Sequence, residues 1–355
     1  MDAEYSKAVS FDEIYKAFQF ARKGSFWKDS IIEYDINRLY HSVKISRGLK
    51  NRKYRLKGYY KFKIQEREKI RDIQSLHITD RVHQRSLCDN IIIPTSSRSF
   101  IYDNGASQTG KGTHFSRNRL KAHMQKFYRK HGLNGYVLQV DVRKYFESIP
   151  HDYLKQRMAK YYSGEILSDL YAIIDSYDGD KGIGLGSQVS QIFALDALDE
   201  LDHFVKEVLR IKHYGRYMDD MYLIHEDKAY LQHCREHIEC FMQTICGLQM
   251  HPKKTVLFPL KNGIRFLGFH FYLTDTGGVY VKLLKVSEKR MKRKIRKMVH
   301  KGVPEPEIRK TFNSWSAHAM YGDSYYTVKN MESYMINILK ERSVRDEREI
   351  FLRRD

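Results

Sequence analysis

The sequence predicts an α+β fold with an antiparallel sheet, and three observations lead to that prediction. Hydrophobic residues make up 42% of the 355 positions, which is enough to form a core and argues against disorder. Short strand-like segments, such as residues 135–141 and 211–225, alternate with longer segments of helical periodicity. The sequence has no internal repeats, and its six prolines form no proline-rich linker. Helices in such a chain are expected to cover one side of the sheet.

The expected elements follow from the periodicity of apolar residues. Helices are predicted at residues 11–48, 78–92, 114–131, 151–175, 188–210, 228–246 and 286–301, with two more in 306–340. Strands are predicted within 49–72, at 135–141, twice within 211–225, and near 254–259, 264–272 and 278–283. Glycines mark two turns between these elements, at residues 103–112 and 182–186.

The charge of the chain points to a polyanionic partner. Lys and Arg number 63 against 43 Asp and Glu, which gives a formal net charge of +20. Such an excess creates a positive field that attracts nucleic acid and makes binding depend steeply on salt. A generic basic protein and a membrane-surface binder are the alternatives. Aromatic residues reach 13%, and those interleaved with Lys and Arg could stack on bases.

The cysteine pattern and the absence of a long apolar run lead us to expect a soluble protein of the cytoplasm. The four cysteines form no Cys-x-x-Cys pair, so a structural zinc site is not expected. Cys234, Cys240 and Cys246 are expected to be ordinary buried thiols. The first ten residues carry acidic side chains and no long apolar run, unlike a signal peptide. No apolar run approaches the roughly 18 residues that a membrane span needs.

The sharpest motif is Tyr217-Met218-Asp219-Asp220, flanked by residues that favour strands. A hairpin would place the two aspartates at its tip. Adjacent carboxylates repel each other unless a positive group lies between them, and magnesium prefers such oxygen ligands. A plain surface turn is the alternative for this motif taken alone.

A second acidic position supports a metal site. Asp141 ends a short apolar strand far upstream of the Met-Asp-Asp turn. A third carboxylate from another strand would complete a site for two metal ions. Two ions about 3.5–4 Å apart can activate an attacking 3′-hydroxyl and neutralise a leaving pyrophosphate.

The order of motifs resembles the palm of reverse transcriptases. Asp141 is followed at the fifth position by Phe146, then come a glycine-rich turn with serine and Tyr-Met-Asp-Asp. Lys253-Lys254-Thr255 and Phe266-Leu267-Gly268 follow in the same order as in that family, and the likeness extends over residues 60–330. The resemblance implies a right-hand polymerase fold with fingers, an antiparallel-sheet palm and a helical thumb.

The resemblance also implies a division of the chain. Residues 1–48 would form an N-terminal helical extension and residues 49–134 the fingers. Residues 135–283 would form the palm, with room for a fingers insertion at 155–180. Residues 284–355 would form a basic helical thumb and a C-terminal tail.

Site residues carry over position by position. Asp141, the Val142 carbonyl, Asp219 and Asp220 match the ligands of two Mg²⁺ ions, for which Mn²⁺ can substitute. Phe146 matches the aromatic gate that excludes a ribose 2′-hydroxyl, with a plain core aromatic as the alternative. Further residues of the nucleotide pocket would be Gly186, Ser187, Gln188, Ser190, Gln191 and Lys254. Lys253 is the alternative to Lys254. The two lysines could also be a solvated charge pair without a role in the pocket.

Contacts to the nucleic acid are implied in the same way. Lys69 and Arg71 match positions at which fingers hold the triphosphate, although a solvated strand face is the alternative. Tyr217 and Met218 would lie near the primer end, and Phe266, Leu267 and Gly268 resemble the primer-grip hairpin. The basic helix would grip the template–primer duplex through its cations, among them Lys289, Arg290, Arg293 and Lys297, over an apolar stripe of Met291, Ile295, Met298 and Val299.

Two departures from the commonest family pattern bear on the biological role. The turn reads Ile183-Gly184-Leu185-Gly186 and continues to Ser190-Gln191, where many relatives have Leu-Pro-Gln-Gly and Ser-Pro. This variant and the stretch from Phe100 to His114 resemble diversity-generating retroelement enzymes and antiphage-defence reverse transcriptases. The altered turn puts standard fidelity in doubt. The sequence also leaves no room for endonuclease or ribonuclease H domains after the thumb.

These features predict an RNA-directed DNA polymerase that makes cDNA from a dedicated non-coding RNA in antiphage defence. Its partners would be the RNA template, a primer–template duplex and dNTPs, with an accessory protein or a second copy as further candidates. A diversity-generating retroelement enzyme is the alternative role. An RNA-dependent RNA polymerase and an inactive RNA-binding module are the remaining rivals.

Overall fold

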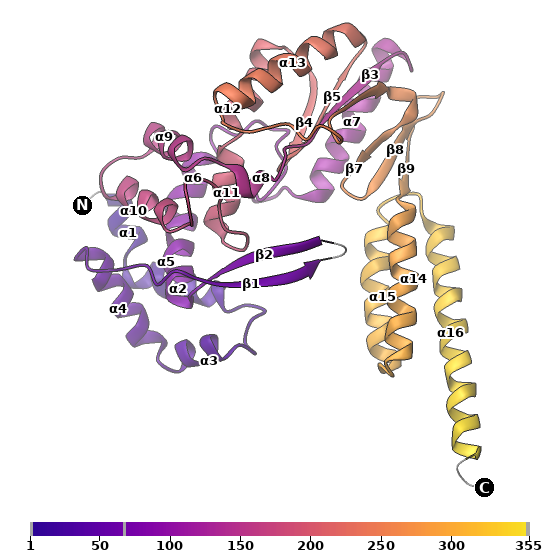
Figure 1. Ribbon diagram of the computed structural model, residues 1–355, viewed down its shortest axis with the longest axis horizontal. Coiled ribbons are helices and arrows are strands. Elements are labelled where there is room, and N and C mark those ends of the chain that lie inside the picture. Colours follow the sequence, from indigo (N-terminus) through magenta and orange to yellow (C-terminus); the bar gives the residue numbers. More distant parts are fainter. Residues whose placement is uncertain (1–2, 67–68, 353–355) are drawn as a thin grey trace. The chain divides into compact units, whose positions relative to one another are not determined.

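The computed structural model describes residues 3–66 and 69–352, and the side chains of Glu66, Lys69, Arg71 and residues 345–352 lie outside that description (Figure 1). The chain forms two units. The first contains residues 1–116, 138–223 and 228–257, and the second contains residues 117–137, 224–227 and 258–355. Each unit is considered by itself.

The first unit opens with the predicted helical extension. Ser10 caps the second helix, since its hydroxyl accepts a hydrogen bond from the Glu13 amide at 3.4 Å. Ile14, Ala17 and Phe18 then share one buried face of that helix. The helices of this part are α1 (Ala3–Ala8), α2 (Phe11–Ala21), α3 (Asp29–Ile36), α4 (Arg38–Lys50), α5 (Ile78–Leu87), a π-helical turn (Cys88–Ile92) and α6 (Ile93–Ser96).

A two-stranded antiparallel hairpin lies between α4 and α5, where strands were predicted. It consists of β1 (Tyr59–Glu66) and β2 (Lys69–Leu76), paired so that Tyr59 faces Leu76. Its purple ribbon extends away from the helices of this unit in Figure 1. The strand starts ten residues later than the predicted range of 49–72, because residues 51–58 form a loop whose last two amides, of Lys57 and Gly58, donate to the Asp80 carboxylate.

A four-stranded sheet has the strand order β4-β5-β3-β6. Gly215 in β4 has no side chain because a Cβ atom there would come within 2.5 Å of the Tyr222 hydroxyl on β5. Four buried residues, Leu231, Cys234, Ile238 and Met242, line one face of the helix that follows the hairpin. The strands are β3 (Tyr136–Val140), β4 (His213–Tyr217), β5 (Asp220–His225) and β6 (Val256–Pro259), and the helices are α8 (Tyr145–Ser148), α9 (His151–Tyr161), α10 (Gly164–Asp175), α11 (Gln188–Asp196), α12 (Asp199–His203) and α13 (Lys228–Thr244).

Two predictions about this part are wrong in detail. The helix predicted at 188–210 is broken into α11, α12 and a π-helical turn at Phe204–Val208. The break brings three buried aspartates to two buried arginines: Asp196 and Asp199 to Arg157, and Asp202 to Arg216. Cys240 is exposed, whereas Cys234 and Cys246 are buried as expected.

The second unit contains a three-stranded antiparallel sheet and the C-terminal helices. The sheet is β7 (Ile264–Phe266), β8 (Phe269–Leu273) and β9 (Val279–Leu283), and most of α7 (Thr113–His131) belongs to the same unit. The single strand predicted at 264–272 is therefore two strands, because Leu267 and Gly268 both have positive φ and reverse the chain.

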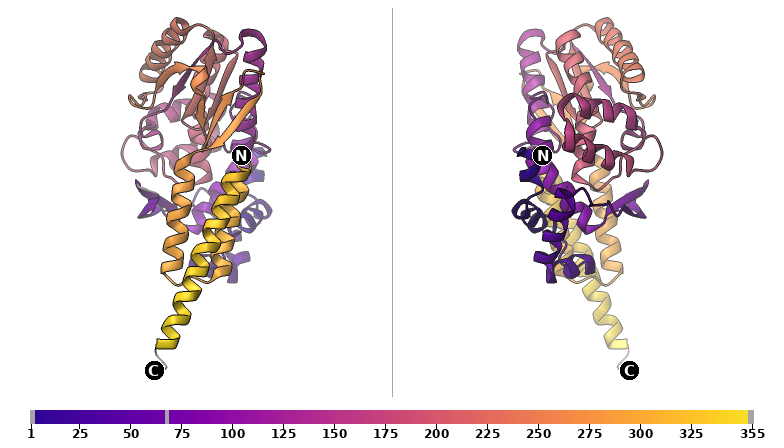
Figure 2. Two further views of the ribbon diagram at one scale, coloured as in Figure 1. Left: turned by 90° about the vertical axis from the view of Figure 1, so that its right-hand side faces the viewer. Right: turned by 90° about the vertical axis from the view of Figure 1, so that its left-hand side faces the viewer.

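Three helices follow the three-stranded sheet: α14 (Lys285–His300), α15 (Glu305–Ala319) and α16 (Tyr325–Leu352). They lie side by side in both views of Figure 2, coloured orange to yellow. Their shared core consists of Met291, Ile295, Ile308, Phe312, Met331 and Met335, and Met298 and Val299 pack against it. The predicted apolar stripe of the basic helix is confirmed. In the part of the chain that the structure describes, no helix is long and apolar enough to cross a membrane.

Candidate active site

The Met-Asp-Asp turn joins two paired strands of the four-stranded sheet, as predicted. Tyr217 ends β4, Asp220 begins β5, and Met218 takes the left-handed conformation with φ of 56°. A side chain other than glycine is strained by roughly 1–2 kcal/mol in this conformation. The turn therefore needs support from its surroundings.

Arg216 supplies that support from inside the protein. Its guanidinium is 1% exposed and donates a hydrogen bond to the Met218 carbonyl at 3.2 Å. The same group pairs with both carboxylate oxygens of Asp202, at 2.6–2.9 Å, and donates to the Leu195 carbonyl. Tyr214 donates to Asp202 as well, at 2.6 Å. This buried network ties the turn to α12 and to α11.

Asp141 follows β3, the strand next to β5 in the sheet. The segment after α13 runs along residues 141–143: the His251 amide donates to the Asp141 carbonyl at 2.8 Å, and the Arg143 amide donates to Gln249 at 2.8 Å. Val142 and Met250 form an antiparallel bridge between these hydrogen bonds. The pairing brings Lys254 to Asp141, with Nζ 2.9 and 2.8 Å from the two carboxylate oxygens.

The three aspartates interact through their charges. Burial and, after it, the negative charges of Asp219 and Asp141 raise the pKa of Asp220 to about 7, while Lys254 opposes them. Carboxylates whose charges raise one another's pKa in this way are a set of oxygen donors that fits a hard divalent cation. As the side chains stand, no three acidic, imidazole or thiol groups among the described residues are arranged to hold a metal ion. The Asp141 carboxylate instead forms an ion pair with the Lys254 ammonium.

The backbone of Phe146 is hydrogen-bonded to the glycine-rich turn. It is half-buried, and its carbonyl accepts a hydrogen bond from the Ile183 amide at 2.7 Å. Gly182 has φ of 95°, and a Cβ atom there would lie 3.0 Å from the Glu147 carbonyl oxygen. Glycine at 182 thus allows the turn to approach α8.

The residues after Gly186 begin α11 and contact α5 and the π-helical turn that follows it. The Ser187 hydroxyl caps that helix and donates to Gln84 at 3.2 Å, and the Ser190 hydroxyl lies 2.7 Å from that of Tyr177. Gln188 donates to Asp89 at 3.2 Å. The Gln191 amide oxygen accepts from Ser107 at 3.3 Å, so its side chain meets the loop at 103–112. Lys69 and Arg71 lie on β2, and their side chains are outside the described ones.

The primer-grip candidates lie in the second unit. Phe266 is buried, and Leu267 and Gly268 form the turn between β7 and β8. Arg117 of α7 is 2% exposed and donates two hydrogen bonds to the Leu267 carbonyl, at 3.2 and 2.7 Å. Its guanidinium also lies over the rings of Phe269 and Tyr321.

The cations of α14 are exposed on the same unit. Lys289, Arg293 and Lys297 recur every four residues and therefore share one face, with Arg290 beside them. Lys292 and Arg296 lie instead over the ring of Tyr334 on α16, at 5.1 and 5.6 Å from its centroid. The helix thus presents exposed cations on a face that differs from its packing face.

Several residues of the site were not predicted. Arg216, Asp202 and Arg117 act through buried hydrogen bonds that depend on tertiary contacts. The one available signal was the presence of a charged residue inside a segment predicted as a strand, such as Arg216 within His213–Tyr217. A buried charge requires a partner, but the sequence does not identify that partner.

Comparison with known proteins gives one family and many similar solved structures, including two distantly related telomerases. Residues 60–271 match the family described as "Reverse transcriptase (RNA-dependent DNA polymerase)". A telomerase from Candida albicans, solved with a TWJ fragment of telomeric RNA, has a TM-score of 0.52 at 13% identity, over 79% of this chain and 55% of that chain. An apo telomerase from Candida tropicalis, truncated from its C-terminal domain, has a TM-score of 0.45 at 16% identity, over 62% and 54%.

The family match and the first of these structures establish the right-hand polymerase fold. This chain spans just over half the length of the telomerase chains, 55% and 54%. No curated protein sequence gives a significant match.

Proposed function

Because this chain belongs to the reverse transcriptase (RNA-dependent DNA polymerase) family, whose members are nucleotidyltransferases, we propose that it copies RNA into DNA with two divalent metal ions. The observation that carries the proposal is that the charges of Asp219 and Asp141 act on Asp220, whose pKa is raised to about 7 by burial and by these two charges together. These three carboxylates come from separate parts of the chain, and their charges act on one another. Mg²⁺ is the cation such hard oxygen donors favour, and Mn²⁺ is its expected substitute.

The residues of the chain take separate roles in this proposal. Asp141, Asp219, Asp220 and the Val142 carbonyl would hold the cations, which when bound lower the pKa of the attacking hydroxyl and neutralise the triphosphate. Phe146, held against the turn at 182–186, would line the sugar pocket and exclude a 2′-hydroxyl. Lys254 lies beside Asp141, where its ammonium can donate a proton to the departing pyrophosphate.

Other contacts belong to the same proposal. Gly186, Ser187, Gln188 and Gln191 would shape the pocket for the incoming nucleotide, and Lys69 and Arg71 would hold its triphosphate. Tyr217 and Met218 would contact the primer end. Phe266, Leu267 and Gly268 would serve as primer grip, and the exposed cations of α14 would bind the phosphates of the duplex.

Primer extension on an RNA template tests the polymerase. With Mg²⁺ present we expect synthesis from dNTPs, much weaker synthesis from rNTPs, and no synthesis after chelation of divalent ions. Asp219→Ala should abolish synthesis and leave RNA binding nearly unchanged, whereas Asp12→Ala, on the exposed side of α2, should keep both. Better use of rNTPs would contradict the assignment as a reverse transcriptase, and synthesis by Asp219→Ala would contradict the metal site.

For the biological role we propose cDNA synthesis from a dedicated non-coding RNA in antiphage defence, in the cytoplasm. Support comes from the turn at 183–191 and the stretch at 100–114, which resemble those of defence-associated enzymes. The same residues also resemble retroelement enzymes, so that role is the second candidate. Sequencing of the RNA and DNA that co-purify with the protein separates them: one structured RNA from the same locus supports defence, and a repeat copied into a variable target gene supports the retroelement.

A further inference from the structure

A cavity of about 510 Å³ opens between the N-terminal helices and the loop that leads into β1. Four cations line it: Lys44 on α4, and Lys53, Arg55 and Lys57 on the loop. Glu33 is the one acidic residue in its lining. All of these residues belong to the first unit, and none is among those assigned above to the polymerase.

The loop that carries three of these cations is fixed in place by a buried acid. Asp80 of α5 is fully buried, and its carboxylate accepts hydrogen bonds from the Lys57 amide at 2.7 Å and the Gly58 amide at 3.1 Å. The Tyr54 hydroxyl donates to the same carboxylate at 2.6 Å. The Asp80 carboxylate is thereby bound by backbone amides and the Tyr54 hydroxyl. The lysine side chains are left to face the cavity's solvent.

The cations of the cavity have no acidic partner within the described part of the chain. The Arg55 guanidinium donates to the carbonyls of Arg52 and Tyr54, at 3.4 and 3.3 Å, and the Lys44 ammonium lies over the ring of Tyr40. Lys53 and Lys57 form no ion pair there. Such a concentration of unpaired positive charge in a concave site favours an anionic ligand.

The imidazoles of His41 and His77 and the exposed ring of Tyr60 also line the cavity. Burial and the charge of Lys57 keep the pKa of His77 below its usual value, and burial and Lys44 do the same for His41. Both rings are thus neutral near pH 7 and available as flat or hydrogen-bonding surfaces. Tyr60 is 60% exposed, and its ring stacks on His77 with centroids 6.2 Å apart. Exposed aromatic rings beside cations are the usual arrangement for a base next to its phosphate.

We propose that this cavity binds one nucleotide, with the phosphate on Lys53, Lys57 and Lys44 and the base on Tyr60. The volume lies in the range of small-molecule sites, about 300–1,000 Å³. The ligand is either a free nucleotide or a nucleotide of an RNA strand, because both present the same phosphate and base. The inference does not rest on polymerase activity, since the cavity contains none of the proposed metal ligands.

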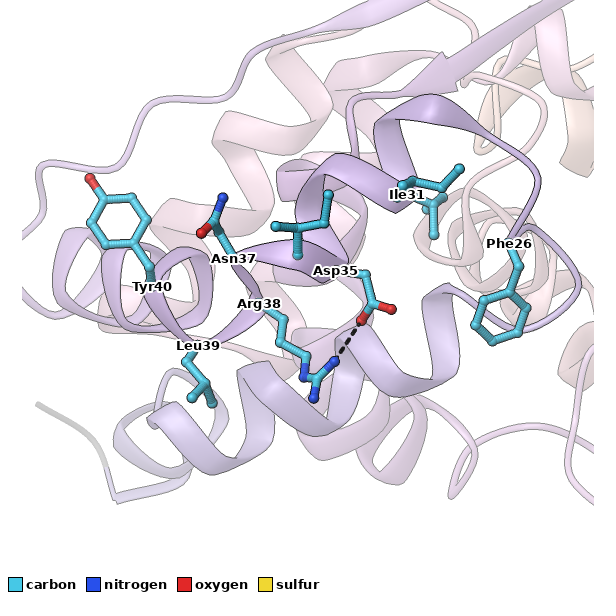
Figure 3. A pocket seen from close by; sticks show the side chains of 9 residues that line it. Phe26, Ile31, Asp35, Asn37, Arg38, Leu39 and Tyr40 are labelled. Carbon is cyan, nitrogen blue, oxygen red and sulfur yellow. Dashed lines mark hydrogen bonds and ion pairs between the residues drawn. The ribbon is translucent and has the colours of Figure 1, made fainter.

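A neighbouring hollow serves as a contrast. It is lined by Phe26, Ile31, Ile32, Asp35, Ile36, Asn37, Arg38, Leu39 and Tyr40, and Figure 3 shows the Arg38 guanidinium pointing at the Asp35 carboxylate. That ion pair, at 3.4 Å, neutralises the one cation of the lining. Most of the other lining residues are apolar, and the hollow offers a phosphate no unpaired cation.

The test measures binding to the full chain in EDTA, which removes divalent ions from the carboxylate site. The probes are adenosine 5′-monophosphate and a 5′-phosphorylated oligouridine decamer. The variants are Lys53→Gln/Lys57→Gln and Tyr60→Ala, and the charge-matched control is Lys16→Gln/Lys50→Gln, both exposed and outside the cavity. Thermal unfolding of each variant checks that the fold is kept.

The double variant should raise the Kd of the bound probe about tenfold and reduce the slope of log Kd against log salt by about 1.4 for a strand. Tyr60→Ala should weaken binding by a similar factor. Loss of adenosine monophosphate binding identifies a free nucleotide, and loss confined to the decamer identifies an RNA nucleotide. If the affinities of both probes change no more in the double variant than in the control, the proposal is wrong.

Discussion

At the scale of single residues, the ion pair between Lys254 and Asp141 determines the state of the site without metal. The ammonium lies 2.8 Å from one carboxylate oxygen of Asp141 and lowers the pKa of Asp220. It compensates one of three negative charges and leaves the repulsion between Asp219 and Asp220 in place. Burial and this remaining repulsion both favour the protonated form of Asp220, whose pKa is raised to about 7.

The titration of Asp220 is the first prediction. Without divalent ions, carbon NMR of the Asp220 carboxyl should give a pKa of about 7, and Asp219→Asn should lower it because one repelling charge is removed. Since the folded-state pKa lies above the unfolded value of 3.8, this group stabilises the fold at low pH, and its contribution is lost as the pH rises through about 7. A wild-type pKa near 3.8 would contradict the coupling.

Lys254 and its neighbour give the second prediction. The sequence left Lys253 and Lys254 as alternatives, and in the structure it is Lys254 that pairs with Asp141. Lys254→Met should lower kcat about 100-fold through loss of a proton donor, whereas Lys253→Met should leave kcat nearly unchanged. Single-nucleotide incorporation measures both. Equal effects of the two substitutions would show that the lysines act only through general charge.

At the scale of elements, the hairpin of β4 and β5 depends on a buried charge network. Arg216 and Asp202 are both fully buried, and the arginine also binds the carbonyl of the strained Met218. Breaking one partner of a buried pair leaves the other charge without compensation, which costs about 3–5 kcal/mol.

The third prediction concerns this pair. Arg216→Ala should reduce the free energy of unfolding by about 3–5 kcal/mol in a denaturant titration, because Asp202 remains buried and charged. The exposed Arg143→Ala should change it by less than about 0.5 kcal/mol. Replacing both partners, as in Arg216→Met with Asp202→Leu, should recover much of the loss. A single variant as stable as the wild type would contradict the network.

Elements with a strong local signal were predictable from the sequence. The apolar strand before Asp141, the strands around Met218 and the stripe of α14 all follow from periodicity. The break after Asp196 was not predictable, since the apolar pattern from Val189 to Leu201 continues through it. Its cause is the burial of three aspartates against Arg157 and Arg216, which only the tertiary structure displays.

At the scale of the whole molecule, the net charge of +20 predicts a salt-dependent interaction with nucleic acid. Part of that charge lies on the exposed face of α14, whose opposite face packs on Ile308, Phe312 and Met331. The sequence indicated both the cations and the apolar stripe. It did not indicate that Lys292 and Arg296 pack on Tyr334, because Tyr334 is far along the chain.

The fourth prediction measures this charge. Replacing Lys289, Arg293 and Lys297 by Gln should weaken binding of a template–primer duplex and reduce the salt slope by roughly 0.9 for each phosphate that a cation no longer neutralises. Lys301→Gln/Lys310→Gln, two exposed positions elsewhere in this helical part, is the control. Fluorescence anisotropy over a salt series gives the slopes. An unchanged slope in the triple variant would place the duplex on another surface.

The most direct test of the metal site is local cleavage of the backbone by bound iron. Fe²⁺ substituted for Mg²⁺ and activated with ascorbate and peroxide generates hydroxyl radicals that cut the chain near the ion. We predict cuts in two segments, around residue 141 and around residues 218–220, and loss of both cuts in Asp141→Asn and in Asp219→Asn. Cleavage at one segment alone, or cuts that survive either substitution, would show that these aspartates do not share a metal site.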